Sequence, residues 1–377
     1  MNLLRRNRDL RVDFFRGLAL WWIFMDHIAG NMFAVITIHN YALSDATEIF
    51  VLLAGYGAGL AYGRAMDRHG WVYAAADTLK RAWTLYIAHI FLFVVFSTQV
   101  SYSAAALDRA NYLDELHLDV LADAPYRALL KALMLGYQPA YLDILPMYIA
   151  LLILFAFALP LLRRPALLAA LSFAMYAFAR LSEANLPSWT ADGWYFNPLT
   201  WQFLFMLGAI LSYAPPGLPR HKRWLDVLAG LVIVTGIAIQ WIIWPNPAVA
   251  ASLPLSLARL LLEVDKQGLH PFRLINMLAF TWVVIRCVPA SAAWLRSRWA
   301  APVALAGQHS LPVFCTGIFL SFLGRIVLET NRAWPVQLAV NVAGTVVLVA
   351  VGALAAWYRE KGRPPAPARP AGGATAV

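Results

Sequence analysis

Residues 11–30 read RVDFFRGLALWWIFMDHIAG, and this stretch determines how the rest of the chain is interpreted. It is apolar enough to cross a bilayer, yet it carries the ionisable residues Asp13, Arg16, Asp26 and His27. A charged side chain at the centre of a membrane helix costs about 2.5–3.5 kcal/mol, so it persists where it faces a protein interior or a water-filled cavity. The stretch therefore predicts a first membrane helix with a polar interior face.

Helical spacing places most of these ionisable side chains on one face. Arg16 and His27 are 11 residues apart. That is about three helical turns, which puts them on the same side of a helix, roughly 16 Å from each other. Asp13 falls about 40° from that line. We therefore expect an acid, a cation and an imidazole to follow one stripe across most of the membrane depth.

The composition extends this interpretation to the whole chain. Its 377 residues are 61% hydrophobic and 13% charged, whereas soluble domains average about half apolar and a quarter charged. The formal net charge of +10 could indicate nucleic-acid binding. The basic residues, however, alternate with apolar runs in the positive-inside pattern of membrane proteins. The sequence therefore predicts an all-α, polytopic membrane protein that contacts the lipid bilayer and binds no nucleic acid.

Ten apolar runs approach the length of about 20 residues that a bilayer requires. They are 14–34, 47–65, 82–100, 142–160, 165–182, 199–214, 225–244, 272–289, 302–323 and 335–357. With the N-terminus inside, most Lys and Arg fall in cytoplasmic segments, which include Arg5, Arg6, Arg8 and Arg11. We expect a bundle of about ten spans with both termini cytoplasmic. Residues 1–360 would form this membrane domain, and the Pro/Ala/Gly-rich residues 361–377 a disordered cytoplasmic tail.

The predicted outer connections differ from the inner ones. Residues 101–141 carry several acids, and the leucines at 113–121 predict one short amphipathic helix. Residues 245–271 contain SLARLLLEVDKQG, which predicts another helix at the membrane surface. Cys287 and Cys315 lie in apolar runs without ligand spacing, so we expect buried thiols, no disulfide and no metal site.

Other predicted spans carry polar residues at membrane depth. Glu48 begins the second span from the outside, so we expect it near the depth of His27. Arg81 lies at the inner end of the third span, Asp143 begins the fourth, and His309 and Ser310 lie in the ninth. Because the ninth span starts from the inner side, His309 would reach His27 only if a helix were broken.

An imidazole beside carboxylates suits general-base catalysis. The ordinary pKa of histidine, about 6.5, lets His27 take a proton near neutrality. A carboxylate on the other ring nitrogen would set the tautomer and stabilise the imidazolium, and Glu48 and Asp26 are both candidates. A cation near the inner face, such as Arg16 or Arg81, could hold a phosphate.

These positions also have structural interpretations. Asp13 and Arg16 could form an i,i+3 ion pair that neutralises one helix end. Glu48 and Asp143 each lie where a carboxylate favours a helix N-terminus. A membrane transporter of a small charged metabolite would also bury Asp, Arg and His in its spans. That alternative ideally carries an internal repeat, which we do not find in this sequence.

The motif D-x-x-R-G in the first span, with a His eleven residues after the Arg, resembles the acyltransferase-3 superfamily of ten-helix membrane enzymes. The segment EIFVLLAGYGAGL is similar to that superfamily's F-x-L-S-G-F segment, with Ala54 where Ser is usual. This departure puts any Ser-specific role there in doubt. Within the superfamily, the run DFFRG…MDH…DATEIFVLLAG resembles the OpgC-type succinyltransferases of osmoregulated periplasmic glucans. The strong part of the resemblance covers about residues 11–63.

The resemblance implies a mechanism in the bacterial inner membrane. Acyl-CoA, with succinyl-CoA implied by the subfamily, would dock from the cytoplasm as a co-substrate, and no cofactor would be bound permanently. His27 matches the essential His of the superfamily and would activate a hydroxyl of a periplasmic glucan, with Glu48 or Asp26 beside it. Arg16 matches the motif Arg and would hold CoA phosphate or order the pore. The remaining expected substrate-binding residues are Asp13, Arg81, Asp143, His309 and Ser310.

Overall fold

The computed structural model describes residues 9–189, 192–215, 217 and 222–361, and every regular element within them is helical. The longer helices are α1 (Leu10–Asp26), α2 (Ala46–Ala58), α4 (Trp71–Ala106), α8 (Ile144–Ala158), α9 (Pro165–Ser182), α10 (Pro198–Tyr213), α11 (Arg223–Ala238), α14 (Pro271–Cys287), α16 (Ser310–Thr330) and α17 (Trp334–Lys361). The shorter α-helices are α3 (Arg64–His69), α5 (Asn111–Glu115), α6 (Asp119–Asp123), α7 (Pro125–Leu133), α12 (Pro247–Ser252), α13 (Leu255–Leu262) and α15 (Ala300–Gln308). Short 3₁₀ or π turns are η1 (Met32–Ile36), η2 (Ile38–Asn40), η3 (Gly59–Gly63), η4 (Leu159–Arg163), η5 (Ile239–Ile243) and η6 (Ala293–Arg296). The predicted basic residues Arg5, Arg6 and Arg8, and residues 362–377 of the predicted tail, lie outside the described residues.

Seven helical stretches within the described residues are long and apolar enough to cross a membrane, judged by length and composition. They are Ala46–His69, Trp71–Ala106, Ile144–Arg163, Pro165–Ser182, Arg223–Ile243, Ser310–Thr330 and Trp334–Lys361. Helix α10 is apolar but shorter, and α1 and α14 have 17 residues each. The all-helical prediction is confirmed. The count of ten spans and the cytoplasmic placement of both termini stay predictions.

Two predicted spans differ from the observed helices. The span predicted at 14–34 ends as an α-helix at Asp26, and the chain continues through Gly30, at a φ of 77°, into η1 and η2. The span predicted at 302–323 is interrupted at His309, whose φ of −118° and ψ of 44° are not helical. It therefore consists of two helices, α15 and α16. Both differences arise from local backbone conformation within sequence that stays apolar.

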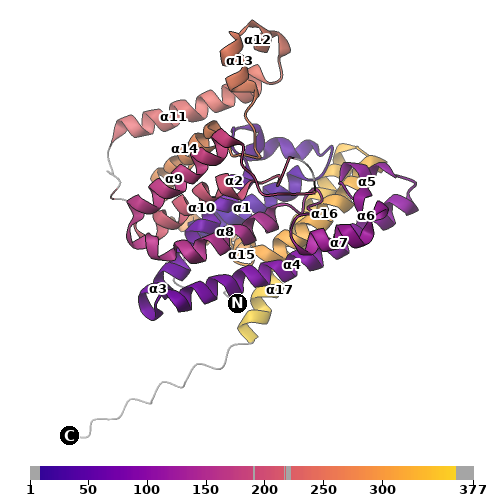
Figure 1. Ribbon diagram of the computed structural model, residues 1–377. Helices are drawn as coiled ribbons and strands as arrows, with labels where there is room; N and C mark the ends of the chain where they lie inside the picture. Colours follow the sequence, from indigo (N-terminus) through magenta and orange to yellow (C-terminus); the bar gives the residue numbers. More distant parts are fainter. Residues whose placement is uncertain (1–8, 190–191, 216, 218–221, 362–377) are drawn as a thin grey trace, which may run out of the picture.

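The predicted outer connections fold into short helices. Residues 101–141 contain α5, α6 and α7 in place of the single amphipathic helix predicted there, and Figure 1 shows these three grouped beside α4 and α16. Helices α12 and α13 form a lobe that stands away from the other helices (Figure 1). Helix α13 confirms the helix predicted within SLARLLLEVDKQG. The prediction of two buried thiols is wrong, because Cys287 is exposed and Cys315 is half-buried.

Close backbone contacts fix α1 at the centre of the bundle. Helix α1 packs against α15, α16 and α2, and α2 packs against α10. A Cβ atom on Gly17 would lie 1.9 Å from the carbonyl oxygen of Val303, and a Cβ on Gly55 would lie 1.9 Å from that of Phe205. Any side chain would clash at these distances, and small residues are what allow membrane helices to approach so closely. Helix α1 is therefore packed closely against α15, and α2 against α10.

Candidate functional site

A cavity of about 320 Å³ lies at the C-terminal end of α1, and His27 lines it. The remaining lining residues are Ile23, Thr47, His117, Gln138, Ala140, Tyr141, Asp143, Ile144, Tyr195, Phe196, Lys266, Phe314 and Ile318. Most of the polar groups among them belong to connections between the longer helices. This space, called the polar cavity below, is therefore built from segments that are far apart in the sequence.

His27 is the C-cap residue of α1, and its ring has two defined contacts. Its Nδ1 lies 2.6 Å from the carbonyl oxygen of Ile23, and its ring meets that of Tyr141 edge to face with 4.6 Å between centroids. A carbonyl oxygen only accepts, so Nδ1 donates its proton to it and Nε2 of the neutral imidazole keeps its lone pair. His27 thus has the tautomer that a general base requires.

The two carboxylates expected to orient the imidazole have other partners. Asp26 Oδ1 accepts a 2.7 Å hydrogen bond from the hydroxyl of Thr37. Glu48 accepts from Nε of Arg273 at 2.6 Å and from the backbone N–H of Asp45 at 2.9 Å, which closes a capping box at the start of α2. A backbone carbonyl therefore sets the tautomer of the imidazole where a carboxylate was expected. The interpretation of Glu48 as a charge at a helix N-terminus is confirmed.

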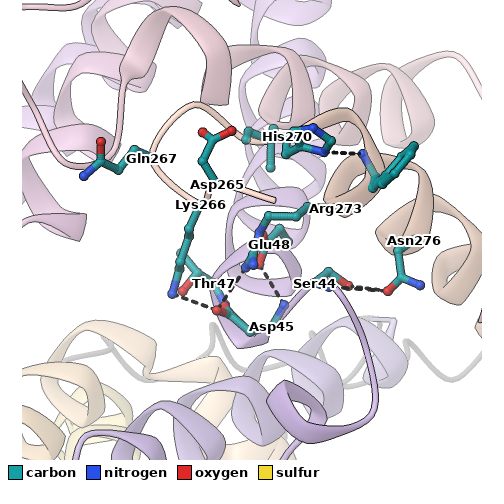
Figure 2. A network of polar contacts seen from close by, with 12 residues as sticks. Ser44, Asp45, Thr47, Glu48, Asp265, Lys266, Gln267, His270, Arg273 and Asn276 are labelled. Atoms are coloured by element: carbon teal, nitrogen blue, oxygen red, sulfur yellow. Dashed lines mark hydrogen bonds and ion pairs between the residues drawn. The ribbon is translucent and has the colours of Figure 1, made fainter. Parts of the chain in front are cut away.

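Four charged side chains form a buried network beside the polar cavity (Figure 2). Arg273 contacts Glu48 at 2.6 Å and Asp45 at 3.1 Å, and Nζ of Lys266 lies 2.7 Å from the same Asp45 oxygen. Two cations and two carboxylates balance in charge, which lowers the cost of burying them. Burial alone would lower the pKa of Lys266, but the carboxylates of Asp45 and Glu48 raise it above its ordinary value. Lys266 is therefore an ammonium cation.

The loop at residues 263–270 carries Lys266 to the polar cavity, and it is fixed on both sides of this residue. Asp265 pairs with Arg180 at 2.7 Å. The carbonyl oxygen of Gln267 accepts a 3.0 Å hydrogen bond from the indole Nε1 of Trp201. Contacts on both neighbours limit how far the loop can move, so the ammonium group is held at the cavity wall.

Sequence reasoning did not identify Lys266 or Arg273 as site residues. Lys266 lies within the predicted surface helix SLARLLLEVDKQG and Arg273 at the start of the next predicted span, both on the side assigned to the outside. Basic residues are disfavoured in short outer connections by the positive-inside rule. The presence of Lys266 and Arg273 on the outer side, against this rule, was the feature of the sequence that could have identified them as site residues.

Asp143 is the predicted binding residue that joins His27 at the polar cavity. It is the N-cap residue of α8, and it lines the cavity from the segment that precedes this helix. Burial raises the pKa of the Asp143 carboxyl group to about 6. The polar cavity therefore holds one carboxyl group whose charge changes within the physiological pH range.

The other predicted binding residues lie away from the polar cavity. Asp13 and Arg16 are in the first half of α1, and Arg81 is half-buried on α4. His309 lies between α15 and α16, and Ser310 is the first residue of α16. Arg16 donates a 2.7 Å hydrogen bond to the carbonyl oxygen of Leu53. The backbone of Asp13 contacts Gly307, two residues before the break at His309. We call Asp13, Arg16, Arg81, His309 and Ser310 the inner group, after the inner side on which the sequence prediction places them.

A second cavity of about 520 Å³ is lined by α1, α2 and α14 and is mostly apolar. Its lining includes Asp9 and Arg11 at the start of α1, and Ile38 and Tyr41 beyond its end. Asp9 and Arg11 pair with each other at 2.7 Å, so their charges are neutralised locally. We call this space the apolar groove.

Comparison with known proteins gives a match over nearly the full length. A family model described as OpgC protein matches residues 8–360. This range includes α1, the buried ion network and all residues that line the polar cavity. No curated protein and no solved structure matches the chain.

Proposed function

Because this chain belongs to the OpgC family, which is associated with glucan succinylation, we propose that it is a membrane O-acyltransferase. It moves a succinyl group from acyl-CoA on the cytoplasmic side to hydroxyl groups of a periplasmic glucan. One observation carries the proposal beyond the family. His27 combines a fixed Nδ1 hydrogen bond with a place on a cavity that is polar and aromatic.

In the proposed reaction, Nε2 of His27 takes the proton of a glucan hydroxyl while that oxygen attacks the thioester carbonyl of the donor. A C–O bond forms, the C–S bond breaks, and the CoA thiolate takes the proton back from the imidazolium. The products are a glucan ester and CoA thiol, so atoms and charges balance. The hydrogen bond to the Ile23 carbonyl keeps the ring oriented through both proton transfers.

The lining of the polar cavity supports a carbohydrate acceptor. Tyr141 and Tyr195 offer aromatic surface, while Gln138 and Asp143 offer hydrogen-bonding groups. Binding sites for small organic ligands typically combine such apolar and aromatic surface with a few convergent polar groups. We therefore assign the polar cavity to the glucan hydroxyl and its sugar ring.

We assign the approach of the donor to the inner group of predicted residues. Arg16 shares a helix face with His27 about three turns away, and a guanidinium group is suited to a CoA phosphate. Asp13, Arg81, His309 and Ser310 accompany it in this assignment. A location in the bacterial inner membrane is part of the proposal, because it brings cytoplasmic acyl-CoA and a periplasmic acceptor to opposite faces of one protein.

The test is transfer by the purified full-length protein in detergent. The protein is incubated with succinyl-CoA labelled in the acyl group, with and without a periplasmic glucan, and both free CoA thiol and glucan-bound label are measured. We expect thiol and ester to appear in equal amounts, and ester only when glucan is present. If neither product forms with succinyl-CoA or acetyl-CoA while proteoliposomes take up labelled succinate, the proposal is overturned in favour of a transporter.

A further inference from the structure

Lys266 places an ammonium group on the wall of the polar cavity that also holds the imidazole of His27. Building on the proposed function, we propose that Lys266 binds the free carboxylate of the succinyl group and makes the enzyme selective for dicarboxylic acyl donors. The acyl carbonyl must reach the hydroxyl activated by His27, so the far end of a four-carbon acyl group is also placed within this cavity.

The charges around the polar cavity favour this assignment. A carboxylate that leaves water for a partly apolar cavity needs a cation or several hydrogen bonds, because an uncompensated charge there costs several kcal/mol. Among the described residues that line the cavity, Lys266 is the one lysine or arginine. Lys266 is therefore the group that can compensate a donor carboxylate.

Exposure separates Lys266 from the other members of its network. The side chain of Lys266 is 28% exposed, whereas those of Asp45, Arg273 and Glu48 are 9%, 7% and 0% exposed. The network therefore presents one cation to a ligand and keeps its other charges behind it. Figure 2 shows Lys266 reaching from its loop toward Asp45, with Arg273 and Glu48 on the far side of that carboxylate.

The network also leaves Lys266 with binding capacity. An ammonium group has three N–H donors, and Asp45 accepts one of them at 2.7 Å. The same Asp45 oxygen is shared with Arg273, which lies 3.1 Å away. Although the network as a whole is balanced in charge, the N–H groups of Lys266 that Asp45 does not accept can donate to a ligand carboxylate. The fixed loop on either side of Lys266 reduces the entropy lost when a ligand binds.

The test compares three donors that differ in one feature at a time. Succinyl-CoA and butyryl-CoA carry four-carbon acyl groups with and without a carboxylate, and acetyl-CoA is the short reference. We expect wild type to prefer succinyl over butyryl, and Lys266→Met to lower the succinyl-to-butyryl ratio of kcat/KM about 10- to 100-fold, as for a lost charged hydrogen bond. Lys266→Arg keeps the cation and retains most of the preference.

The other outcomes of this experiment distinguish a wrong assignment of Lys266 from a wrong proposed function. An unchanged ratio in Lys266→Met overturns the assignment and leaves the proposed function intact, since transfer itself persists. No transfer by wild type from any of the three donors overturns the proposed function instead. If Lys266→Met fails to accumulate, Lys266→Met/Asp45→Asn restores the charge balance, and Asn remains a good N-cap for α2. The succinyl-to-butyryl ratio of kcat/KM is then compared between this double variant and Asp45→Asn alone.

Discussion

The polar cavity and the apolar groove adjoin the same helix but are built from different parts of the chain. The polar cavity, about 320 Å³, takes most of its polar groups from connections that cover the end of α1. The apolar groove, about 520 Å³, is lined mainly by the sides of helices. The larger of the two cavities thus has fewer side chains that could take part in a reaction. The convergence of ionisable groups distinguishes the candidate site in this protein. The volume of a cavity does not show which cavity is the site.

Helix α1 contributes to both spaces through different faces. With 100° per residue, Phe15 and Trp22 on the groove side lie roughly 120° around the helix from Arg16 and His27. One face therefore carries Arg16 and His27, and another carries large apolar side chains. If the two regions have different roles, matched substitutions on the two faces should have very different effects.

The largest expected effect is that of His27→Ala on transfer. Removing a general base typically costs about 10²- to 10⁴-fold, so we expect the rate of glucan acylation to fall by this factor in purified protein. Trp22→Ala is the matched control on the groove side of the same helix, and we expect its rate to stay within a few-fold of wild type. Similar losses in both variants, at equal yield and melting temperature, would show that the two faces do not differ in function.

The second effect concerns the stability of the network beside the polar cavity. Arg273→Met leaves Glu48 buried without its cation, and breaking a buried pair in this way costs about 3–5 kcal/mol. Arg273→Met/Glu48→Gln removes the orphan charge, keeps the Asp45–Lys266 pair and retains an oxygen for the capping box, so we expect it to recover most of the loss. Thermal unfolding in detergent measures both variants. A double variant no more stable than the single one would mean that the charges are not coupled.

The sequence predicted the part of this site that local spacing determines. The cost of charge in a membrane and the helical period together directed attention to α1 and to His27, which lines the polar cavity, because both depend only on residues within three turns. The role of Arg16 stays a prediction. The helical class of the chain followed from hydrophobicity alone. The end of α1 at Asp26 and the break at His309 were not predicted, because the apolar runs continue through both positions.

The rest of the site depends on contacts between distant residues. Asp45 and Arg273 meet across 228 positions of sequence, and no periodicity within a single helix encodes that pairing. Glu48 was expected to face the imidazole because both lie at one depth. The depth of a residue in the membrane does not specify which way its side chain points around the helix axis. The side chain of Glu48 points toward Arg273. Lys266 reaches the cavity from a loop that contacts Arg180 through Asp265 and Trp201 through Gln267.

A third prediction uses the ionisation of Asp143 in the polar cavity. Burial raises the pKa of Asp143 to about 6 from an ordinary value of 3.8. A raised pKa means that the neutral acid is favoured in the folded protein, so the stabilisation is present below pH 4 and is lost as the pH rises through 6. Asp143→Asn should therefore be about 1–2 kcal/mol more stable than wild type at pH 7.5 and nearly equal at pH 4.

Thermal unfolding of wild type and Asp143→Asn across this pH range provides the measurement. Thr47→Val changes another polar residue of the same cavity without a titratable group, and its difference from wild type should not vary with pH. A stability difference for Asp143→Asn that is constant from pH 4 to 7.5 would contradict the expected ionisation.

The smallest expected effect lies in the apolar groove, and it is the sharpest test of the contrast between the two regions. Val284 on α14 lines the groove, so Val284→Trp would fill part of it and Val284→Ala would enlarge it. Because the groove lies on the face of α1 turned away from Arg16 and His27, we expect both variants to transfer succinyl within about twofold of wild type, with stability changes of about 0.5 kcal/mol. The measurement is kcat/KM for succinyl-CoA. A tenfold loss in Val284→Trp alone would place the donor in the groove, because only the larger side chain obstructs it, and the two spaces would then serve one reaction.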